Sequence, residues 1–590
     1  AICEQMEDPA LAKGLVKRDI IRIVTPGSVT ESSMLVESKN NYYACVYGAA
    51  GTYGLCFCDV STGAFSATQV SGADAMQDAQ NELGSFLPSE ALLGGTAAED
   101  DALADFLRDR FHTCVNLGTD AQFDSALCEA AVTAQFGQSP EALGLANMPC
   151  VIAAAGALLI TLRDLQKNEL PHIRELELYI AGKFMQLDLA ARRNLELTET
   201  LRGREKRGTL LWVLDKTSTA MGKRMLRSWI EQPLVSSAAI NRRLNAVESL
   251  VHQTVQRGDL IEELHYISDL ERLMTRTVYG SATPKEIYAM AQTCDRLPSL
   301  KQQAESCNCP ELAELSAQID ALDDIKQKIY AAVDPEAPST LKDGGVIAKG
   351  YHPEVDELRS IRDNTKGVLA QLEARLRQET GIPKLKIGYN HVFGYFIEVS
   401  NSYKSMVPET YIRKQTLTSG ERYITQELKD LEQEILTAGE RDNALEYEIF
   451  SALRDEICAG AERIQKTAAA VAELDTLASL AVVAVKNSYC CPVVDDSGVI
   501  EIHDGRHPVV ERVLKDALFV PNDTYMGEKE NRVAIITGPN MAGKSTYMRQ
   551  VALITLMAQI GSFVPARAAR IGVVDRIFTR IGASDDLAGG

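Results

Sequence analysis

The cysteines of this sequence do not form any of the patterns that would define a small disulfide-rich or zinc-binding protein. There are 13 of them, an odd number scattered over 590 residues, and none lies in a C-x-x-C pair. Scattered, unpaired cysteines argue against a disulfide framework and indicate a reducing compartment. Without C-x-x-C spacing, a metal cluster is also disfavoured.

The sequence also has no uninterrupted apolar run that we expect to span a bilayer, and its first residues do not form a signal peptide. It opens at Ala1 without a methionine, which we interpret as a fragment or a processed product. Composition is otherwise ordinary for a soluble globular protein, with 45% apolar and 24% charged residues.

Positive charge is scarce, since 61 Lys and Arg face 81 Asp and Glu and give a formal net charge of −20. Phosphate backbones supply most of the non-specific affinity for nucleic acids, so this balance opposes extended DNA binding. Binding depends on where positive charge lies rather than on its total. Any DNA contact should therefore be confined to local basic surfaces.

The strongest motif that is present lies near the carboxyl terminus, where residues 538–545 read G-x-x-x-x-G-K-S. An apolar, β-branched run over 533–537 predicts a buried parallel strand before it. Val551, Ile554 and Met557 recur at helical spacing after it, and Gly561 with Pro565 should end that helix. This context favours a phosphate-binding loop over the alternative, an ordinary glycine turn between strand and helix.

Each residue type in the loop suits a triphosphate with Mg²⁺. Gly538 and Gly543 let the backbone approach an oxyanion, and the N–H groups of the loop and helix then point at it. Lys544 is expected to bridge the β- and γ-phosphates, and the Ser545 hydroxyl to ligate Mg²⁺. The residues that we expect to bind nucleotide are Gly538, Pro539, Asn540, Met541, Ala542, Gly543, Lys544, Ser545 and Thr546.

A carboxylate at the end of a second strand is missing downstream of this loop. Hydrolysis needs such a group to hold Mg²⁺, and Asp585-Asp586 does not follow an apolar strand. Upstream, Asp455-Glu456 lies inside a helical pattern. We therefore expect a nucleotide fold that is cut off partway, and the catalytic residues remain unknown.

The pattern of the first 155 residues predicts a small α/β region of short strands and helices. Residues 20–24 read as a strand, 42–65 as a β-hairpin, and 91–93 as a further strand between helices at 72–87 and 99–111. Asp59, at a strand end, is a candidate nuclease-like carboxylate, but without a partner acid the structural interpretation is favoured.

Long helices with a three-and-four spacing of apolar residues dominate from about residue 156. They suit transmission of a displacement between distant sites, although a passive helical scaffold would have the same pattern. Residues 385–399 interrupt them with two alternating strands, a loop follows over 401–422, and an amphipathic helix is predicted from Tyr423 to Leu436.

Two segments of the chain are locally basic. The loop at 401–422 has a net charge of +2 with Tyr403 and Tyr411 interleaved, so it is either a sugar–phosphate contact or a solvated hairpin. Its candidate DNA-backbone residues are Lys404, Arg413, Lys414 and Arg422. The second segment, residues 202–207, is more simply explained as a solvated loop before a helix.

Ten stretches spread over the whole chain then carry a family resemblance. They are Ala1–Gln5, Val24–Gly27, Asn194–Leu197, Leu214–Gly222, Ile387–Asn390, Gly394–Ile397, Gln415–Leu417, Glu421–Thr425, Ile536–Met541 and Thr579–Gly582. With these residues the chain resembles the bacterial MutS family of DNA mismatch repair proteins. The Pro-Asn-Met variant of the phosphate loop is far more specific than the general pattern.

The resemblance implies a multidomain α+β protein. Its expected parts are the end of a mismatch-binding domain (1–27), a linker (28–37), an RNase H-like α/β connector (38–155), a long-helix core and lever domain (156–379), a β-containing clamp inserted in the levers (380–437), the returning lever helix (438–487) and the first part of a P-loop, ABC-type ATPase domain (488–590). Phe519 resembles the family's adenine-stacking aromatic and Asn540 its phosphate-sensing side chain. ATP or ADP with Mg²⁺ is the implied cofactor.

The family also implies mismatched double-stranded DNA, a second subunit and a MutL-type protein as partners, a cytoplasmic location in a bacterium, and no membrane. In the family, mismatch binding and ATP state are coupled through the levers, and such a coupling is reciprocal. The family's Phe-x-Glu wedge, second-strand carboxylates, signature loop and dimerising helices do not match any residue here, so whether this chain is an ATPase stays open. The alternatives are a MutS-like ATPase without mismatch reading and a non-catalytic helical scaffold with a vestigial phosphate loop.

Overall fold

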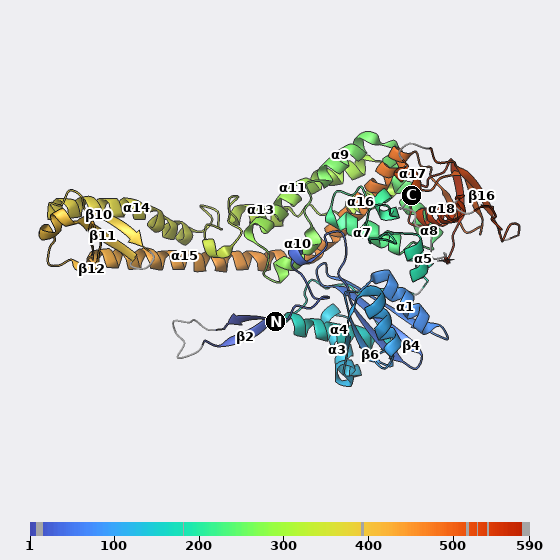
Figure 1. Ribbon diagram of the computed structural model, residues 1–590, viewed down its shortest axis with the longest axis horizontal. Helices are drawn as coiled ribbons and strands as arrows, with labels where there is room; N and C mark the ends of the chain where they lie inside the picture. Colours follow the sequence, from blue (N-terminus) through green and yellow to red (C-terminus); the bar gives the residue numbers. More distant parts are fainter. Residues whose placement is uncertain are drawn as a thin grey trace. The chain divides into compact units, whose positions relative to one another are not determined.

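The computed structural model of the chain describes residues 1–6, 16–180, 182–390, 394–514, 518–527, 529–539 and 542–580 (Figure 1). The chain divides into two compact units. The first unit contains residues 1–279, 292–322 and 458–590, and the second contains residues 280–291 and 323–457. The fold is thus multidomain α+β, as the sequence predicts.

A six-stranded mixed sheet organises the amino-terminal part of the first unit, in the order β7-β6-β3-β4-β5-β8. The predicted hairpin is confirmed as β3 (Tyr43–Ala49) and β4 (Thr52–Asp59), and Ala50 and Gly51 at its turn both have positive φ, as a tight hairpin requires. β5 (Ala64–Ser71) continues the antiparallel order, while β6 (Glu90–Gly95), β7 (Cys114–Leu117) and β8 (Glu177–Leu178) pair in parallel. A separate hairpin joins β1 (Ile2–Gln5) to β2 (Arg18–Arg22).

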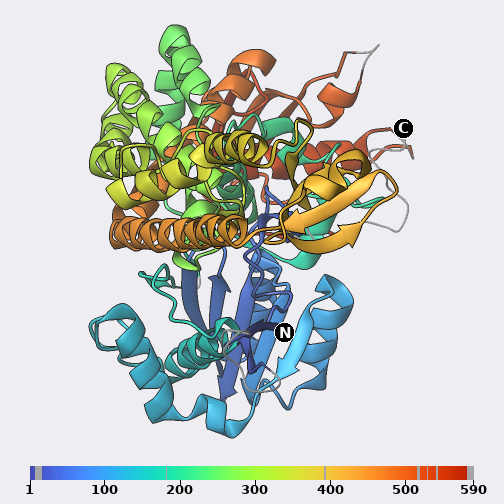
Figure 2. The same cartoon turned by 90° about the vertical axis from the view of Figure 1, so that its left-hand side faces the viewer.

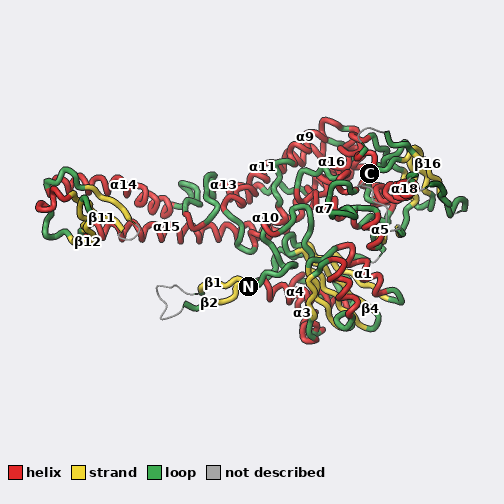
Figure 3. Tube along the Cα trace, viewed as in Figure 1, coloured by secondary structure: helices red, strands yellow, loops and turns green. Residues whose placement is uncertain are grey.

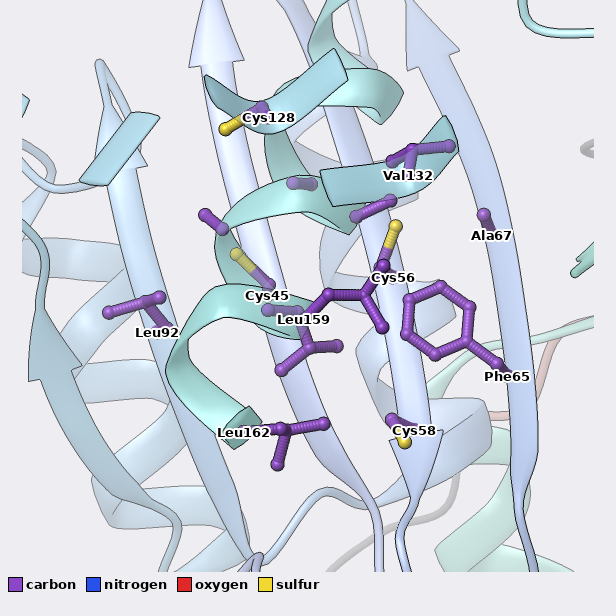
Figure 4. Packing of buried hydrophobic residues seen from close by; sticks show 14 of the residues in the cluster. Cys45, Cys56, Cys58, Phe65, Ala67, Leu92, Cys128, Val132, Leu159 and Leu162 are labelled. Carbon is purple, nitrogen blue, oxygen red and sulfur yellow. The ribbon is translucent and has the colours of Figure 1, made fainter. Parts of the chain in front are cut away.

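Helices cover both faces of this sheet, because side chains alternate between the faces along each strand (Figure 2). Cys45, Cys56 and Cys58 pack with α3 (Ser125–Phe136) and α4 (Pro149–Gln166) on one face (Figure 4). Val46 and Phe57 pack with α1 (Ala75–Phe86) and α2 (Asp101–Phe106) on the other. All 13 cysteines are free, and four of them, Cys128 of α3 included, serve as small core residues here.

Two predicted boundaries in this region differ from the structure. The helix expected over 99–111 ends as an α-helix at Phe106, and a single π-helical turn follows over Leu107–Phe111. α4 crosses residue 155 without a break and packs on β3 and β4, so this packed region extends beyond the end predicted for the connector. Its Gly156 allows the close approach, since a Cβ there would lie 2.3 Å from Cys128 Cα.

A buried histidine beside this sheet should make the stability of the first unit depend on pH. His172 Nε2 lies 3.0 Å from the Val60 carbonyl, its Nδ1 has no hydrogen-bond partner among the described residues, and burial lowers its pKa to about 4. Between pH 6.5 and about 4 the unfolded chain therefore takes up a proton that the folded chain does not. We expect this difference to remove roughly 3 kcal/mol of the free energy of unfolding by pH 4.

The measurement is urea unfolding at several pH values for the wild type and His172→Gln. The variant should lose less stability between pH 6.5 and 4 than the wild type, whatever its stability at pH 7. His252→Gln, at an exposed position, is the matched control and should keep the wild-type pH slope. Equal slopes for wild type and His172→Gln would contradict the assignment.

The rest of the first unit is mainly helical and is built around α16 (Ala461–Asn487), which contacts α7, α8, α10 and α12. The helices of this region are α5 (Leu189–Asn194), α6 (Leu210–Leu214), α7 (Ala220–Glu231), α8 (Ser237–His252), α9 (Thr254–Leu264), α10 (Leu270–Val278) and α12 (Pro310–Gln318). α11 (Pro284–Ser306) belongs to the second unit up to residue 291 and to the first unit from residue 292. The single apolar pattern predicted from Leu312 to Ile329 is two helices, because α13 (Asp323–Ala332) starts only after a break at which Leu322 has a positive φ.

Two helices reach the length and hydropathy of a membrane span, contrary to the expectation that no apolar stretch would. They are α4 and α16, and 61% and 78% of their most apolar windows are buried inside the structure. Core helices of soluble proteins meet the same criterion, so these two are weak evidence for a membrane.

The second unit holds two long helices, α14 (Pro353–Thr380) and α15 (Gln426–Ala459), with a four-stranded antiparallel sheet at their ends (Figure 3). Ion pairs join the helices, including Arg359 with Glu446 and Arg441 with Glu354 at 3.2 Å. The two predicted strands are confirmed as β10 (Lys386–Asn390) and β11 (Gly394–Ser400).

The sequence analysis did not predict the other two strands of this sheet. The loop predicted over 401–422 contains β12 (Ile412–Thr416), and β13 (Gly420–Ile424) completes the order β10-β11-β13-β12. The helix predicted from Tyr423 is therefore wrong at its start: Tyr423 is in β13, and α15 begins at Gln426. The charged residues of β12 hid its strand character, because β12 is an exposed edge strand with polar side chains on both faces.

Candidate nucleotide and nucleic-acid sites

The phosphate-loop motif lies at the start of α18 (Lys544–Gln559), beside a four-stranded sheet. This sheet has the order β14-β17-β15-β16, formed by β14 (Val493–Asp495), β17 (Ala568–Gly572), β15 (Ile500–Gly505) and β16 (Asn522–Met526). α18 ends before Gly561, as predicted. The Gln559 side chain fixes that end, since its Nε2 donates to the carbonyls of Leu234 (2.7 Å) and Val574 (3.0 Å).

The backbone of the loop has the conformation that its glycines were expected to allow. Gly538 has a φ of +149° and Gly543, directly before α18, a φ of +83°. Residues other than glycine rarely adopt such φ angles, so a substitution at either position would strain the loop. Ala542 and Gly543 are exposed, and Lys544, Ser545 and Thr546 are half-buried.

The Lys544 ammonium closes back onto the loop. It donates to the carbonyls of Gly538 and Pro539, the latter at 2.9 Å. No carboxylate within the described residues forms an ion pair with Lys544. Two neutral carbonyls are weaker partners than a phosphate, so an incoming phosphate can compete for this ammonium.

The strand predicted before the loop is not formed. Residues 533–537 pair with no strand of the described chain, and Val533 and Ile535 are 80% and 88% exposed. An apolar run becomes a buried parallel strand only when neighbouring strands supply hydrogen bonds on both sides, and here none does. This part of the sequence prediction is therefore wrong for the structure.

The structure describes only some of the remaining candidate residues for the nucleotide site. Asn540, Met541 and the pair Asp585-Asp586 lie outside the described residues. Phe519 is half-buried, three residues before β16, and within the described chain no ring contact joins it to the loop. Its expected role against an adenine stays a prediction.

The alternative carboxylates have structural partners. Asp59 is fully buried; it accepts hydrogen bonds from the Asn41 and Ser61 N–H groups at 3.0 and 2.9 Å and from the Ser61 hydroxyl at 2.7 Å. Glu456 forms an ion pair with Lys328 at 2.6 Å. Asp59 thus holds a turn together, which supports its structural interpretation over a nuclease-like role.

The four basic candidates of the inserted sheet are not equivalent. Lys404 pairs with Glu421, whose carboxylate is almost fully buried. Arg422 is mostly buried, lies 3.3 Å from Glu398 and stacks at 4.0 Å over the Phe396 ring. These two cations have internal partners, and their expected role at a DNA backbone stays a prediction.

Arg413 and Lys414 remain as exposed cations on β12. The Arg413 side chain is 60% exposed and only 3.5 Å from Glu421, while Lys414 lies at an irregularity in the pairing with β13 and has no ion pair among the described residues. Lys384 and Lys386 are two further exposed cations, which sequence reasoning missed because it considered only 401–422. Tyr403 and Tyr411 pack against the core of the sheet and are not free to stack on bases.

The second basic segment, 202–207, is an exposed loop before α6, as predicted. Lys206 pairs with Asp215 next to α6, whereas Arg202 and Arg204 line a large cavity together with residues of α5. This juxtaposition depends on tertiary structure, and no sequence signal marked it.

This architecture defines a class: a multidomain α+β protein with a phosphate-loop motif at the head of a helix and a basic sheet inserted between two long helices. Models of the MutS domains match along the chain: domain I at residues 1–33, domain II at 41–174, domain III at 190–481 and domain V at 534–590. The chain belongs to the MutS family of DNA mismatch repair proteins.

Individual relatives agree with this assignment over the whole chain. The DNA mismatch repair protein MutS of Ruminiclostridium cellulolyticum is 48% identical over 590 residues, and that of Symbiobacterium thermophilum is 48% identical over 592. The protein of the same name from Lachnoclostridium phytofermentans is 47% identical over 591. This chain covers 67%, 67% and 63% of the three relatives, respectively, or about two thirds of their length.

Proposed function

We propose that the chain acts in DNA mismatch recognition, binding mismatched duplex DNA and coupling that binding to the ATP state. The observation that carries this proposal is the presence, in one MutS chain, of a phosphate loop and of an inserted sheet with exposed cations at the ends of two long helices. Such rods suit coupling between a nucleotide and a distant DNA contact.

The nucleotide site is an ABC-type P-loop in this proposal. Gly538 and Gly543 shape the loop, Lys544 would donate to phosphate oxygens in place of its two carbonyl partners, and the Ser545 hydroxyl would hold Mg²⁺. The residues fit a triphosphate because the loop glycines remove steric hindrance and the lysine is held only by neutral groups. A bound triphosphate supplies the charge that the loop N–H groups and Lys544 recognise. We also propose a second subunit and a MutL-type protein as binding partners of the chain.

The decisive experiment compares binding of a G·T duplex and its homoduplex, with and without ATP and Mg²⁺. The MutS chain carrying these residues should bind the G·T duplex more tightly, and ATP should change the dissociation of the two duplexes differently. Equal affinity in every nucleotide state would contradict mismatch recognition. A nucleotide effect without mismatch preference would instead favour a MutS-like ATPase.

The exposed cations of β12 should contribute to DNA affinity without affecting sequence preference. Arg413→Glu combined with Lys414→Glu should weaken binding to any duplex and reduce the slope of log K against log salt by up to about 1.8, or about 0.9 per lost phosphate contact. Lys342→Glu with Lys349→Glu makes the same charge change at exposed positions just before α14 and should leave the slope unchanged. An unchanged slope in the β12 variant would exclude this edge as the DNA contact.

A further inference from the structure

A cavity of about 1020 Å³ lies in the first unit, away from the phosphate loop. Its walls come from the linker near Lys39, from the turns that follow α1 and the π-helical turn, and from residues 189–204. Lys39 precedes the match to MutS domain II, and the two turns lie within that match. Residues 190–204 lie within the match to domain III. The cavity is therefore lined by parts of the chain that are far apart in sequence.

The lining is strongly basic in a chain whose net charge is −20. Six cationic side chains line it against two acidic ones, Glu199 and Glu231. The cations are Lys39, Arg110, Arg192, Arg193, Arg202 and Arg204. This is a greater local excess of positive charge than that of the 401–422 segment.

The two acids are already paired with a cation that does not line the cavity. Arg227 lies 3.0 Å from Glu231 and 3.7 Å from Glu199. Within the described chain, Arg110, Arg193 and Arg204 form no ion pair with any carboxylate. Arg192 is held in place by the Leu187 carbonyl (3.0 Å) and the Ser85 hydroxyl (2.8 Å), both neutral groups. Three of the six cations thus lack an ion pair within the described chain, whereas the carboxylates of Glu231, Glu82 and Asp188 offset part of the charge of Arg192.

The backbone around the cavity is also unusual. Leu87, His112 and Arg204, all in its lining, have φ values of +49°, +58° and +50°. The π-helical turn that carries Arg110 lies directly before His112. Strained residues and π-helical turns concentrate at ligand sites, where the fold fixes side chains for recognition.

We propose that this cavity binds a small polyphosphate anion, up to the size of a nucleotide, at a site separate from the phosphate loop. Its volume is at the upper end of the roughly 300–1,000 Å³ typical of small-molecule sites. Guanidinium groups suit phosphate because each presents a planar fork of donors that phosphate oxygens accept in pairs. A bound anion would neutralise the mutual repulsion of the arginines and join the walls, so it should stabilise this part of the chain.

The test uses inorganic tripolyphosphate as the probe and isothermal titration at fixed ionic strength. Lys544→Ala is present in every protein so that the phosphate loop does not contribute. The full chain with this background should bind tripolyphosphate with a stoichiometry near one. Adding Arg110→Glu and Arg204→Glu should weaken binding at least tenfold. Arg193→Gln alone, a milder change, should weaken it by about threefold and serves if the double variant fails to fold.

The matched control is Arg108→Glu with Lys285→Glu, which makes the same charge change at exposed positions outside the cavity. It should leave the affinity unchanged. Equal weakening in the cavity and control variants would mean diffuse attraction and would overturn the proposal. It would equally be overturned if the chain carrying Lys544→Ala did not bind tripolyphosphate. GTP and inorganic phosphate as further probes distinguish a nucleotide from a free phosphate as the source of the anion.

Discussion

Replacing Lys544 by alanine should abolish nucleotide binding and leave the fold intact. The ammonium is the only cationic side chain within the loop motif, and it now donates to two carbonyls of the loop itself. In the nucleotide complex it would donate to phosphate oxygens, and hydrogen bonds to charged groups are each worth roughly 1.5–3 kcal/mol. Losing two of them corresponds to an affinity loss of roughly 100-fold or more.

The measurement is thermal unfolding with increasing ADP or ATP and Mg²⁺. For the wild type, ligand at about 100 times its dissociation constant should stabilise the folded state by roughly 2.7 kcal/mol. At the same concentration Lys544→Ala should be stabilised by no more than about 0.4 kcal/mol, because its affinity is at least 100-fold lower. Its unfolding temperature without nucleotide should be close to wild type. Among the described residues its side chain bonds to the Gly538 and Pro539 carbonyls, both in the loop, so the core should not be disturbed.

Lys529→Ala is the matched control, since Lys529 lies in the same part of the chain and no ion pair involving it is present among the described residues. It should retain the full nucleotide shift. If Lys544→Ala kept that shift, the loop would not be the nucleotide site, and the phosphate motif would be a glycine turn. If both variants lost the shift, the cause would be the removal of a positive charge from this part of the chain and not the loss of a motif residue.

The outcome for the loop shows what local sequence can and cannot predict. The glycines at 538 and 543 and the helix from Lys544 follow from local preferences, and the structure has them at the predicted positions. The strand at 533–537 depends on neighbours elsewhere in the chain, and its apolar residues do not reveal whether those neighbours are in place. A local pattern therefore identified the motif but not the sheet around it.

The basic side chains show the same limit for the candidate sites. Charge counting gave Lys404, Arg413, Lys414 and Arg422 equal weight, yet Lys404 and Arg422 have internal partners. Glu398 and Glu421 become their partners only through the pairing of β11 with β13. Likewise, Arg110 and Arg204 are 94 positions apart in sequence and line one cavity only in the folded chain. Contacts across strands and across domains are not visible in a local charge pattern.

Replacing Arg224 by alanine should produce a large loss of stability. Arg224 lies on α7, is almost fully buried, and forms a two-point ion pair with Asp269, both distances being 2.7 Å. It also donates to Glu271 at 2.6 Å and to the Glu37 carbonyl in the linker at 3.2 Å. The pKa of the Arg224 guanidinium is raised by these two carboxylates despite its burial, and burial raises the pKa of Glu271. The group is therefore a buried charge cluster in which Arg272 also lies close to the two carboxylates, and Arg224 is the cation that forms hydrogen bonds with both of them.

Removing that cation leaves two carboxylates close together in a poorly solvated site. Breaking a buried ion pair by deleting one partner typically costs about 3–5 kcal/mol, because the remaining charge stays buried and unpaired. We expect this loss in the unfolding transition of the first unit, together with looser attachment of the linker at Glu37. Arg224→Lys should be intermediate, because a single ammonium cannot reproduce the two-point contact with Asp269.

The measurement is urea unfolding of the wild type and variants, following the midpoint of the transition that contains the first unit at an unchanged slope. Lys223→Ala, on the next residue of α7, is the control: its ammonium is 3.7 Å from Glu37, and it should cost less than about 1 kcal/mol. Lowering the pH should partly rescue Arg224→Ala, because protonation of Asp269 and Glu271 removes the uncompensated charge. A cost similar to that of Lys223→Ala, or no rescue at low pH, would show that water or another cation reaches the two carboxylates, and α7 would then be attached to the linker by packing rather than by charge.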